Sequence, residues 1–259
     1  MSSQPRTTRR RTWIWNVLGG ITLSLITFQM IPTPQFNVPY STLYYSPDGE
    51  LVDATLADDD RFRFPPDRNV PPKYHEALLT HLDEGFHTHP GVEPMLLAQA
   101  LIEPDNRSPQ ACTLTQHVVR LARNRAPRTF KAHLVEGLIA LKLEQANTKE
   151  NILRLYASHA PFGSNIIGIE AASWYYFAHT SEDLSWAEAA TLAVLPTAPS
   201  TPSEAELTEH VIEARNDLLH NLHTQGTIST MTYSMAVGER LVATLHDLNA
   251  TQGTAKPGT

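Results

Sequence analysis

The sequence contains a single cysteine, Cys112, among its 259 residues. No internal disulfide can form, so we expect packing alone to hold the fold together. Basic residues are also few: 20 lysines and arginines stand against 27 aspartates and glutamates, for a net charge of −7. With no basic patch of interleaved aromatic residues, this balance argues against nucleic-acid binding. Hydrophobic residues make up 41% of the chain and charged residues 18%, which argues against global disorder and allows one sizeable core with a small lobe beside it.

The first forty residues differ in kind from the rest. An apolar run of nineteen residues extends from Trp13 to Ile31, interrupted only by Asn16 and Gln29 as strongly polar groups, and four arginines precede it. About 20 apolar residues cross a bilayer, and basic residues mark the cytoplasmic side. We therefore predict a basic cytoplasmic tail over residues 1–12, a transmembrane anchor over residues 13–31, and a globular domain outside the cytoplasm. A cleaved signal peptide is the alternative, but no small-x-small site follows the run, and the run is long for one.

Beyond the anchor, the chain is irregular at first and then helical. Residues 39–70 include a tyrosine-rich run, a Pro47-Asp48-Gly49 turn and then Leu51-Val52, a pattern that predicts a short hairpin. Apolar periodicity and capping residues then predict helices over residues 73–85, 94–103, 113–125, 129–146, 148–158, 185–196 and 201–226, with a last pair over residues 229–248. We expect a mainly α domain over residues 39–248 and a small, polar, disordered tail over residues 249–259.

Five short signatures follow one another along this domain. They are Asp83-x-x-Phe86-x-x-His89-x-Gly91, Gln110-Ala111-Cys112-Thr113-Leu114-Thr115-Gln116-His117, His133-x-x-Glu136 continuing to Glu144, Ala160-Pro161-Phe162-Gly163-Ser164-Asn165, and Leu184-Ser185-Trp186-Ala187-Glu188 ending in Leu195-Pro196-Thr197-Ala198-Pro199-Ser200. In this order they resemble the signatures of the family 51 peptidoglycan glycosyltransferases, most closely those of the 1C type of penicillin-binding proteins. Five signatures in order, with sensible gaps, are far more specific than any one of them.

The resemblance implies a fold and a reaction. The fold would be a lysozyme-like, mainly α glycosyltransferase domain with a small lobe at the membrane end. The family polymerises lipid II at the outer face of the inner membrane: the 4-hydroxyl of an acceptor sugar attacks the anomeric carbon of the growing chain, and the lipid pyrophosphate leaves. Lipid II, peptidoglycan strands and the inner membrane are therefore the implied partners, with other cell-wall synthesis proteins as further candidates.

The first signature departs from the family at a position that carries chemistry. In the family it begins E-D-x-x-F, and the glutamate is the general base, whereas here Leu82 occupies that position. Leucine has no atom that accepts a proton, and loss of a general base costs about 10²–10⁴-fold in rate. Asp83 and Glu84 lie about 100° and 200° further around a helix, so either would replace the base only if the helix ended early. Gly85 permits such an end, which makes Asp83 a candidate catalytic group.

Glu136 matches the second essential glutamate of the family, which assists the donor site. Its apolar neighbours predict partial burial and a raised pKa, so Glu136 is the other catalytic candidate. The candidate substrate-binding residues are Thr113, Thr115, Gln116, His117, Arg120, Arg128, Lys131 and His133. His117 and His133 replace a glutamine and a lysine of the family, and a neutral histidine would hold pyrophosphate more weakly than lysine. For the basic residues, a surface role in solubility is the alternative.

No metal site and no second enzymatic domain are predicted. His75-Glu76 lacks the second histidine of H-E-x-x-H, so a zinc hydrolase is not expected. His89 matches a structural histidine of the family, and Cys112 is expected to be a buried, inert side chain. A divalent cation at the pyrophosphate is left open as the one cofactor candidate. The motifs S-x-x-K, S-x-N and K-T-G are absent from the sequence, so we expect no transpeptidase domain and no penicillin binding.

Two functions remain. The first is a monofunctional peptidoglycan glycosyltransferase whose catalysis is reduced or re-routed through Glu136 and neighbouring acids. The second is a catalytically silent relative that binds lipid II or glycan strands, or scaffolds cell-wall enzymes. The departures at Leu82, Gln110-Ala111, His117 and His133 cluster in the site while the last two signatures persist, and this distribution favours the silent protein. A lytic enzyme of similar fold is a distant third, against which the five signatures argue.

Overall fold

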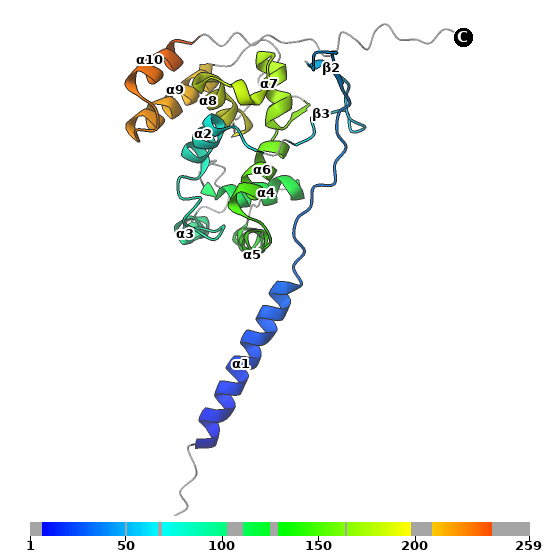
Figure 1. The fold of residues 1–259 in the computed structure, drawn as a ribbon. Helices are drawn as coiled ribbons and strands as arrows, with labels where there is room; N and C mark the ends of the chain where they lie inside the picture. Colours follow the sequence, from blue (N-terminus) through cyan, green and yellow to red (C-terminus); the bar gives the residue numbers. More distant parts are fainter. Residues whose placement is uncertain are drawn as a thin grey trace, which may run out of the picture.

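The computed structural model describes residues 7–49, 51–66, 69–102, 111–124, 129–163, 165–197 and 209–239. Most of these residues are helical, which confirms the mainly α class (Figure 1). In chain order the elements are α1 (Thr7–Gln29), β1 (Leu43–Tyr45), β2 (Leu51–Ala54), β3 (Phe62–Arg63), α2 (Pro72–Leu82), α3 (Pro94–Ile102), α4 (Leu114–Arg123), α5 (Phe130–Ala146), α6 (Lys149–His159), β4 (Ile166–Ile167), α7 (Ile169–Phe177), the 3-10 turn η2 (Ser181–Asp183), α8 (Trp186–Val194), the 3-10 turn η3 (Leu195–Thr197), α9 (Glu209–Thr224) and α10 (Thr230–Gly238).

Helix α1 projects from the helical body, and an extended stretch joins the two (Figure 1). The C-terminal end of α1 meets α5, where the ammonium of Lys142 donates to the side-chain oxygen of Gln29 and lies 5.5 Å from the ring centroid of Phe28. The anchor predicted over residues 13–31 falls largely within this helix. Among the helices of the described residues, none combines the length and the apolarity that crossing a bilayer demands, so the predicted transmembrane helix is not confirmed.

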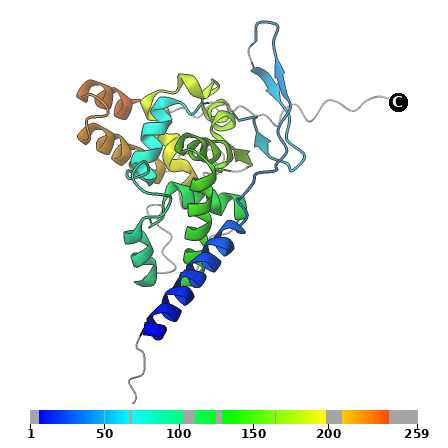
Figure 2. The same cartoon turned by 60° about the horizontal axis from the view of Figure 1, so that its bottom comes forward.

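The predicted hairpin is confirmed. Strands β1 and β2 pair antiparallel, with Leu43 opposite Ala54 and Tyr44 opposite Asp53. Gly49 lies in the connecting turn at φ +86°, a conformation that glycine adopts without steric cost. A second, parallel pair joins β3 to β4 and was not predicted from the sequence; strands of two residues are too short to show a period. The hairpin stands to one side of the helices (Figure 2).

The helical body is built around α2, which packs against α8 and α9, while α4 packs against α5 and α6. The apolar stripe of α2 explains its central place, because Tyr74, Ala77, Leu78 and Leu82 recur at helical spacing and all are buried. Helix α8 is alanine-rich and buried on nearly every side, so its neighbours can approach it closely. The core also takes in Phe86 and Phe162 from the connecting turns.

Most helix boundaries follow from capping residues. Ser185 and Glu188 form the predicted capping box at the start of α8, and Thr148 caps α6 as predicted. Helix α2 ends at Leu82 instead of continuing to residue 85, because the next residue leaves the helical conformation. Helix α7 was missed: it is apolar on all sides, and its N-cap, Gly168, offers no capping side chain. The helix start predicted near residue 201, the second helix of the pair predicted over residues 229–248, and the tail predicted over residues 249–259 lie outside the described residues.

Gly168 is a position where the fold depends on glycine. Its φ is +88° and ψ is 149°, and a Cβ placed there would lie 2.8 Å from the backbone oxygen of Ser158. We expect Gly168→Ala to lower the free energy of unfolding by about 1–3 kcal/mol in urea denaturation. Gly238→Ala is the matched control, because a Cβ at Gly238 would meet nothing within 4 Å. Equal stabilities of the two variants would contradict the assignment.

Candidate functional site

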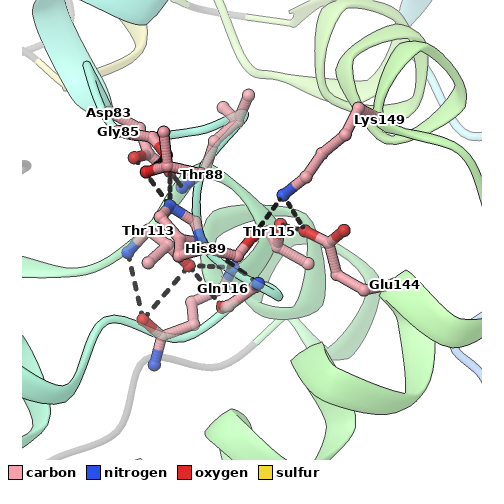
Figure 3. A network of polar contacts seen from close by, with 11 residues as sticks. Asp83, Gly85, Thr88, His89, Thr113, Thr115, Gln116, Glu144 and Lys149 are labelled. Carbon is pink, nitrogen blue, oxygen red and sulfur yellow. Dashed lines mark hydrogen bonds and ion pairs between the residues drawn. The ribbon is translucent and has the colours of Figure 1, made fainter.

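The first three signatures meet where the turn after α2 reaches the start of α4, with α5 alongside. Asp83 is the C-cap of α2, at φ −162° and ψ 74°. Its carboxylate accepts from Nε2 of His89, which lies 2.9 Å from Oδ1 and 3.1 Å from Oδ2, and from the backbone N–H of Leu114, which lies 2.8 Å from Oδ2. Leu114 is the first residue of α4, and a helix N-terminus favours negative charge. Asp83 therefore joins the end of one helix to the start of another (Figure 3).

The ring of His89 has a defined tautomer. The backbone N–H of Gly91 donates to Nδ1 at 3.1 Å, so this nitrogen carries no proton. The proton of a neutral ring must then be on Nε2, from which it is donated to Asp83. His89 thus fastens the turn over residues 84–91 to Asp83, in agreement with the structural role that the family resemblance implies for it.

Leu82 lies in the last turn of α2 and is buried, with 4% of its surface exposed. Helix α2 does end early, as Gly85 permits, but the side chains of Asp83 and Glu84 bind other partners in the protein. Both oxygens of Asp83 are engaged as described above, and Glu84 is exposed and accepts a hydrogen bond of 2.7 Å from Nε2 of Gln225, just beyond α9. Of residues 82 to 84, the one to which the family resemblance assigns the general base, Leu82, is thus the one that has no carboxylate.

The second signature contributes three buried polar side chains at the start of α4, those of Thr113, Thr115 and Gln116. Thr113 is the N-cap of α4 and forms a capping box with Gln116, and its hydroxyl donates to the backbone oxygen of Gly91 at 2.7 Å. Thr115 donates to Oε1 of Glu144 at 2.6 Å. These side chains, predicted to bind substrate, lie close together at the start of α4, and each has a hydrogen-bond partner within the protein (Figure 3).

Lys149 completes this network from the first residue of α6. Its ammonium donates to Oε1 of Glu144 and to the backbone oxygen of His89, both at 2.7 Å, and lies 4.4 Å from the ring centroid of Phe86. Sequence reasoning did not single out Lys149 or assign a role to Glu144. Glu144 ends the third signature, which could have marked it, whereas no motif includes Lys149 and only the folded chain brings the two together.

A buried ion pair links α4 to α5. Nε of Arg120 donates to Oε2 of Glu136 at 2.9 Å, and the side chain of Glu136 is 4% exposed. Its other oxygen, Oε1, is buried and has no hydrogen-bond partner among the described residues. Burial raises the pKa of Glu136 above the usual value of a glutamate, although Arg120 opposes the rise. The burial and raised pKa predicted for Glu136 are thereby confirmed.

Three of the remaining predicted residues lie on α4 and α5. His133 is buried one turn before Glu136. Lys131 is exposed at the start of α5, and His117 is half-buried, with its ring edge-on to that of Tyr156 and the ring centroids 6.1 Å apart.

Cys112 is buried, and burial raises the pKa of its thiol to about 12, as expected for an inert side chain. Arg128 and Gln110 lie outside the described residues. Over the described ranges, no group of three or more histidine, cysteine or acidic side chains could hold a metal ion.

Comparison with known proteins identifies the family. The model of a family described as transglycosylase matches residues 48–223. Penicillin-binding protein 1C of Escherichia coli (strain K12) is 35% identical over 230 residues, which cover 86% of this chain and 30% of that protein. Penicillin-binding protein 1A of Pseudomonas aeruginosa is 31% identical over 236 residues, covering 88% of this chain and 28% of that protein. The chain belongs to the transglycosylase family. The assignment to glycosyltransferase family 51 is thus confirmed.

Among transglycosylase relatives of known structure, penicillin-binding protein 1A of Haemophilus influenzae matches with a TM-score of 0.44 and 21% identity, covering 80% of this chain and 22% of that chain. At this TM-score, the family assignment rests on the sequence matches. This transglycosylase chain spans less than a third of the length of the curated relatives named above.

The Asp83 carboxylate generates a stability prediction. In Asp83→Ala, the buried N–H of Leu114 and Nε2–H of His89 lose their acceptor, which costs about 1–3 kcal/mol for each buried group left unpaired. We expect a marked loss of unfolding free energy in urea denaturation. Glu84→Ala is the control, since Glu84 is exposed, and we expect it to change stability by no more than about 0.5 kcal/mol. Similar losses in both variants would show that Asp83 does not join the helices.

His81, which neighbours Leu82, generates a pH prediction. Burial lowers its pKa from 6.5 to about 4, and its Nε2 lies 2.9 Å from the hydroxyl of Thr197. Between pH 6.5 and about 4, His81 is protonated in the unfolded chain but stays neutral in the folded chain. The free energy of unfolding therefore falls as the pH drops through this range, by up to about 3 kcal/mol. We expect His81→Gln to remove this part of the acid destabilisation when unfolding is measured from pH 7 to pH 4. Parallel profiles for the two proteins would contradict the assignment.

Proposed function

We propose that this chain binds lipid II or its glycan polymer at the outer face of the inner membrane and does not polymerise it at the rate of an active family member. One observation carries the proposal. The general-base position of the family is a buried leucine, Leu82, and the two acidic residues that follow it are directed to other partners. Without a group to take the proton of the acceptor hydroxyl, the chemical step loses about 3–5 kcal/mol of transition-state stabilisation.

Binding of the lipid pyrophosphate does not need the general base that the transfer reaction needs. Pyrophosphate recognition needs cationic donors, and Arg120 lies at the junction of α4 and α5 with 17% of its side chain exposed. A guanidinium carries five N–H donors, so the bond from Nε to Glu136 leaves further donors for phosphate oxygens. Lys131 is exposed nearby on α5. These residues support retention of a lipid pyrophosphate even though the base is missing.

A second candidate is slow polymerisation that uses Glu136. Its raised pKa and its unpartnered Oε1 favour this alternative, because a carboxyl group with a pKa nearer the working pH is a better proton-transfer group. Its ion pair with Arg120 works against it, since the pair stabilises the charged form. If this candidate holds, Glu136→Gln abolishes a low rate of polymerisation that the unmodified chain shows.

The deciding experiment restores a carboxylate at residue 82. We expect the unmodified chain to bind labelled lipid II in detergent and to form polymer far more slowly than an active family member. Leu82→Glu should raise polymerisation by at most about 10²–10⁴-fold, the usual contribution of a general base. Leu82→Gln is the matched control, because it has nearly the same shape and polarity but takes no proton, and its rate should equal that of the unmodified chain.

The two parts of the proposal, binding of lipid II and slow polymerisation, can each be disproved separately. Polymerisation by the unmodified chain at the rate of penicillin-binding protein 1C from Escherichia coli, measured side by side, would exclude a silent protein. Failure of all three proteins to bind lipid II, with circular dichroism showing that they are folded, would exclude the ligand. Binding by Leu82→Glu without turnover would point to the departures at His117 and His133, which the additional substitution His133→Lys tests.

A further inference from the structure

The β1–β2 hairpin exposes large apolar side chains and an open strand edge. Tyr44 is 49% exposed, Tyr45 61% and Val52 69%, and no third strand pairs with the hairpin in the part of the chain that the structure describes. A two-stranded hairpin by itself is marginally stable in water, and an open edge offers backbone groups to another strand. Exposed tyrosines are typical of protein–protein interfaces. The hairpin thus has the features of a place where a further strand docks.

A groove lies between the hairpin and the C-terminal end of α7. Its volume is about 880 Å³, within the range of about 300–1,000 Å³ that is usual for ligand pockets. All four residues of β2, 51–54, line the groove, whereas β1 contributes only Leu43 and Tyr45. Because successive side chains of a strand point to opposite faces, a groove lined by every residue of β2 runs along the edge of that strand. An extended peptide in the groove would therefore lie beside β2.

The lining of the groove is negatively charged. Asp53 lies on the hairpin side, and Glu170 and Asp183 lie on the opposite side. Neither lysine nor arginine occurs among the described residues that line the groove, and its histidine, His179, pairs with Glu188 at 3.1 Å. The fixed negative charge of this lining therefore favours a cationic occupant.

Two of these carboxylates also bind groups of the protein. Glu170 accepts from Nε1 of Trp174 at 3.0 Å and from the backbone N–H of Ser181 at 3.1 Å, so it shapes the wall of the groove. Asp53 accepts from the backbone N–H of its own neighbour, Ala54, at 2.8 Å. A carbonyl group of a docked strand could accept from this N–H instead and so release Asp53 for a cationic side chain. Strand pairing and ion pairing would then act together.

We propose that the groove binds an extended, basic segment of another protein, which pairs with the edge of β2 and places cationic side chains beside Asp53 and Asp183. Addition of a strand to a sheet edge is a general mode of peptide recognition, in which main-chain hydrogen bonds give affinity and side chains give specificity. The groove shares no lining residue with the candidate functional site. The proposal is therefore independent of whether the chain binds or polymerises lipid II.

Peptide binding tests the charge of the occupant. The probe is a fluorescent peptide of about eight residues, the length of a strand, in which lysine and valine alternate. It is titrated into the full chain in neutral detergent and followed by fluorescence anisotropy, and a control peptide carries glutamate in place of each lysine. We expect the lysine peptide to bind at least about tenfold more tightly, because the carboxylates of the groove attract it and repel the control. Equal affinities would overturn the proposal.

Two double variants test the position of the binding site. Asp53→Asn combined with Asp183→Asn should weaken binding of the lysine peptide about tenfold and leave lipid II binding unchanged. Asparagine keeps an oxygen that accepts from the N–H of Ala54, so the hairpin is retained. Glu209→Gln combined with Asp217→Asn is the matched control, because it removes the same charge from exposed positions of α9 outside the groove. Equal losses in the two double variants would mean that the peptide follows net charge, against the proposal.

Backbone methylation tests the strand pairing. A lysine peptide with every second amide N-methylated keeps its charge but loses the donors of one edge, and we expect it to bind at least about tenfold more weakly. The unmethylated peptide should slow hydrogen exchange of the amides of residues 51–54 about tenfold. Equal binding of both peptides or unchanged exchange would exclude the pairing. If the lysine peptide does not bind the full chain at all, the groove is filled by the chain itself or by a second copy, which light scattering distinguishes, and the proposal is wrong.

Discussion

The Asp83 carboxylate is the contact on which the arrangement of the site depends. It receives one hydrogen bond from the turn after α2 and one from the first N–H of α4, so it fixes where two helices and their connecting turn lie. A carboxylate with both oxygens committed in this way cannot also move to deprotonate a substrate without breaking the helix junction. A catalytic carboxylate would therefore have to come from another position, and the family resemblance assigns that role to the residue before it.

Under the proposed function, this division of roles between residues 82 and 83 explains how the chemistry would be lost while the fold is kept. A general base at residue 82 contributes its carboxylate to the reaction and only its stem to packing. Leucine contributes packing alone, and full burial of a leucine side chain stabilises a protein by about 1.5–3 kcal/mol, whereas a buried, unpaired carboxylate costs free energy. With 4% of its surface exposed, Leu82 stabilises the end of α2 at the point where activity would require an accessible acid.

The sequence predicted elements whose signals are local. The capping box at Ser185 and the turn at Gly49 depend on residues within a few positions of one another, and both were found. Helix α7 was missed because its apolar residues show no one-sided period, and the transmembrane helix is not confirmed. The contact of Lys149 with Glu144 and the backbone of His89 was beyond prediction, because it depends on segments that only the tertiary fold brings together.

The same distinction applies within the candidate site. The second signature made Thr113, Thr115 and Gln116 candidates for substrate binding, but it could not show that their hydrogen bonds are used inside the protein. A motif reports which side chains meet, whereas their role depends on which donors and acceptors remain for a ligand. Here the polar groups of α4 mainly hold the helix in place, and the carboxylate of Glu136 on α5 is buried against Arg120. The proposed function follows from this arrangement, since anion binding draws on several donors and proton removal on one base.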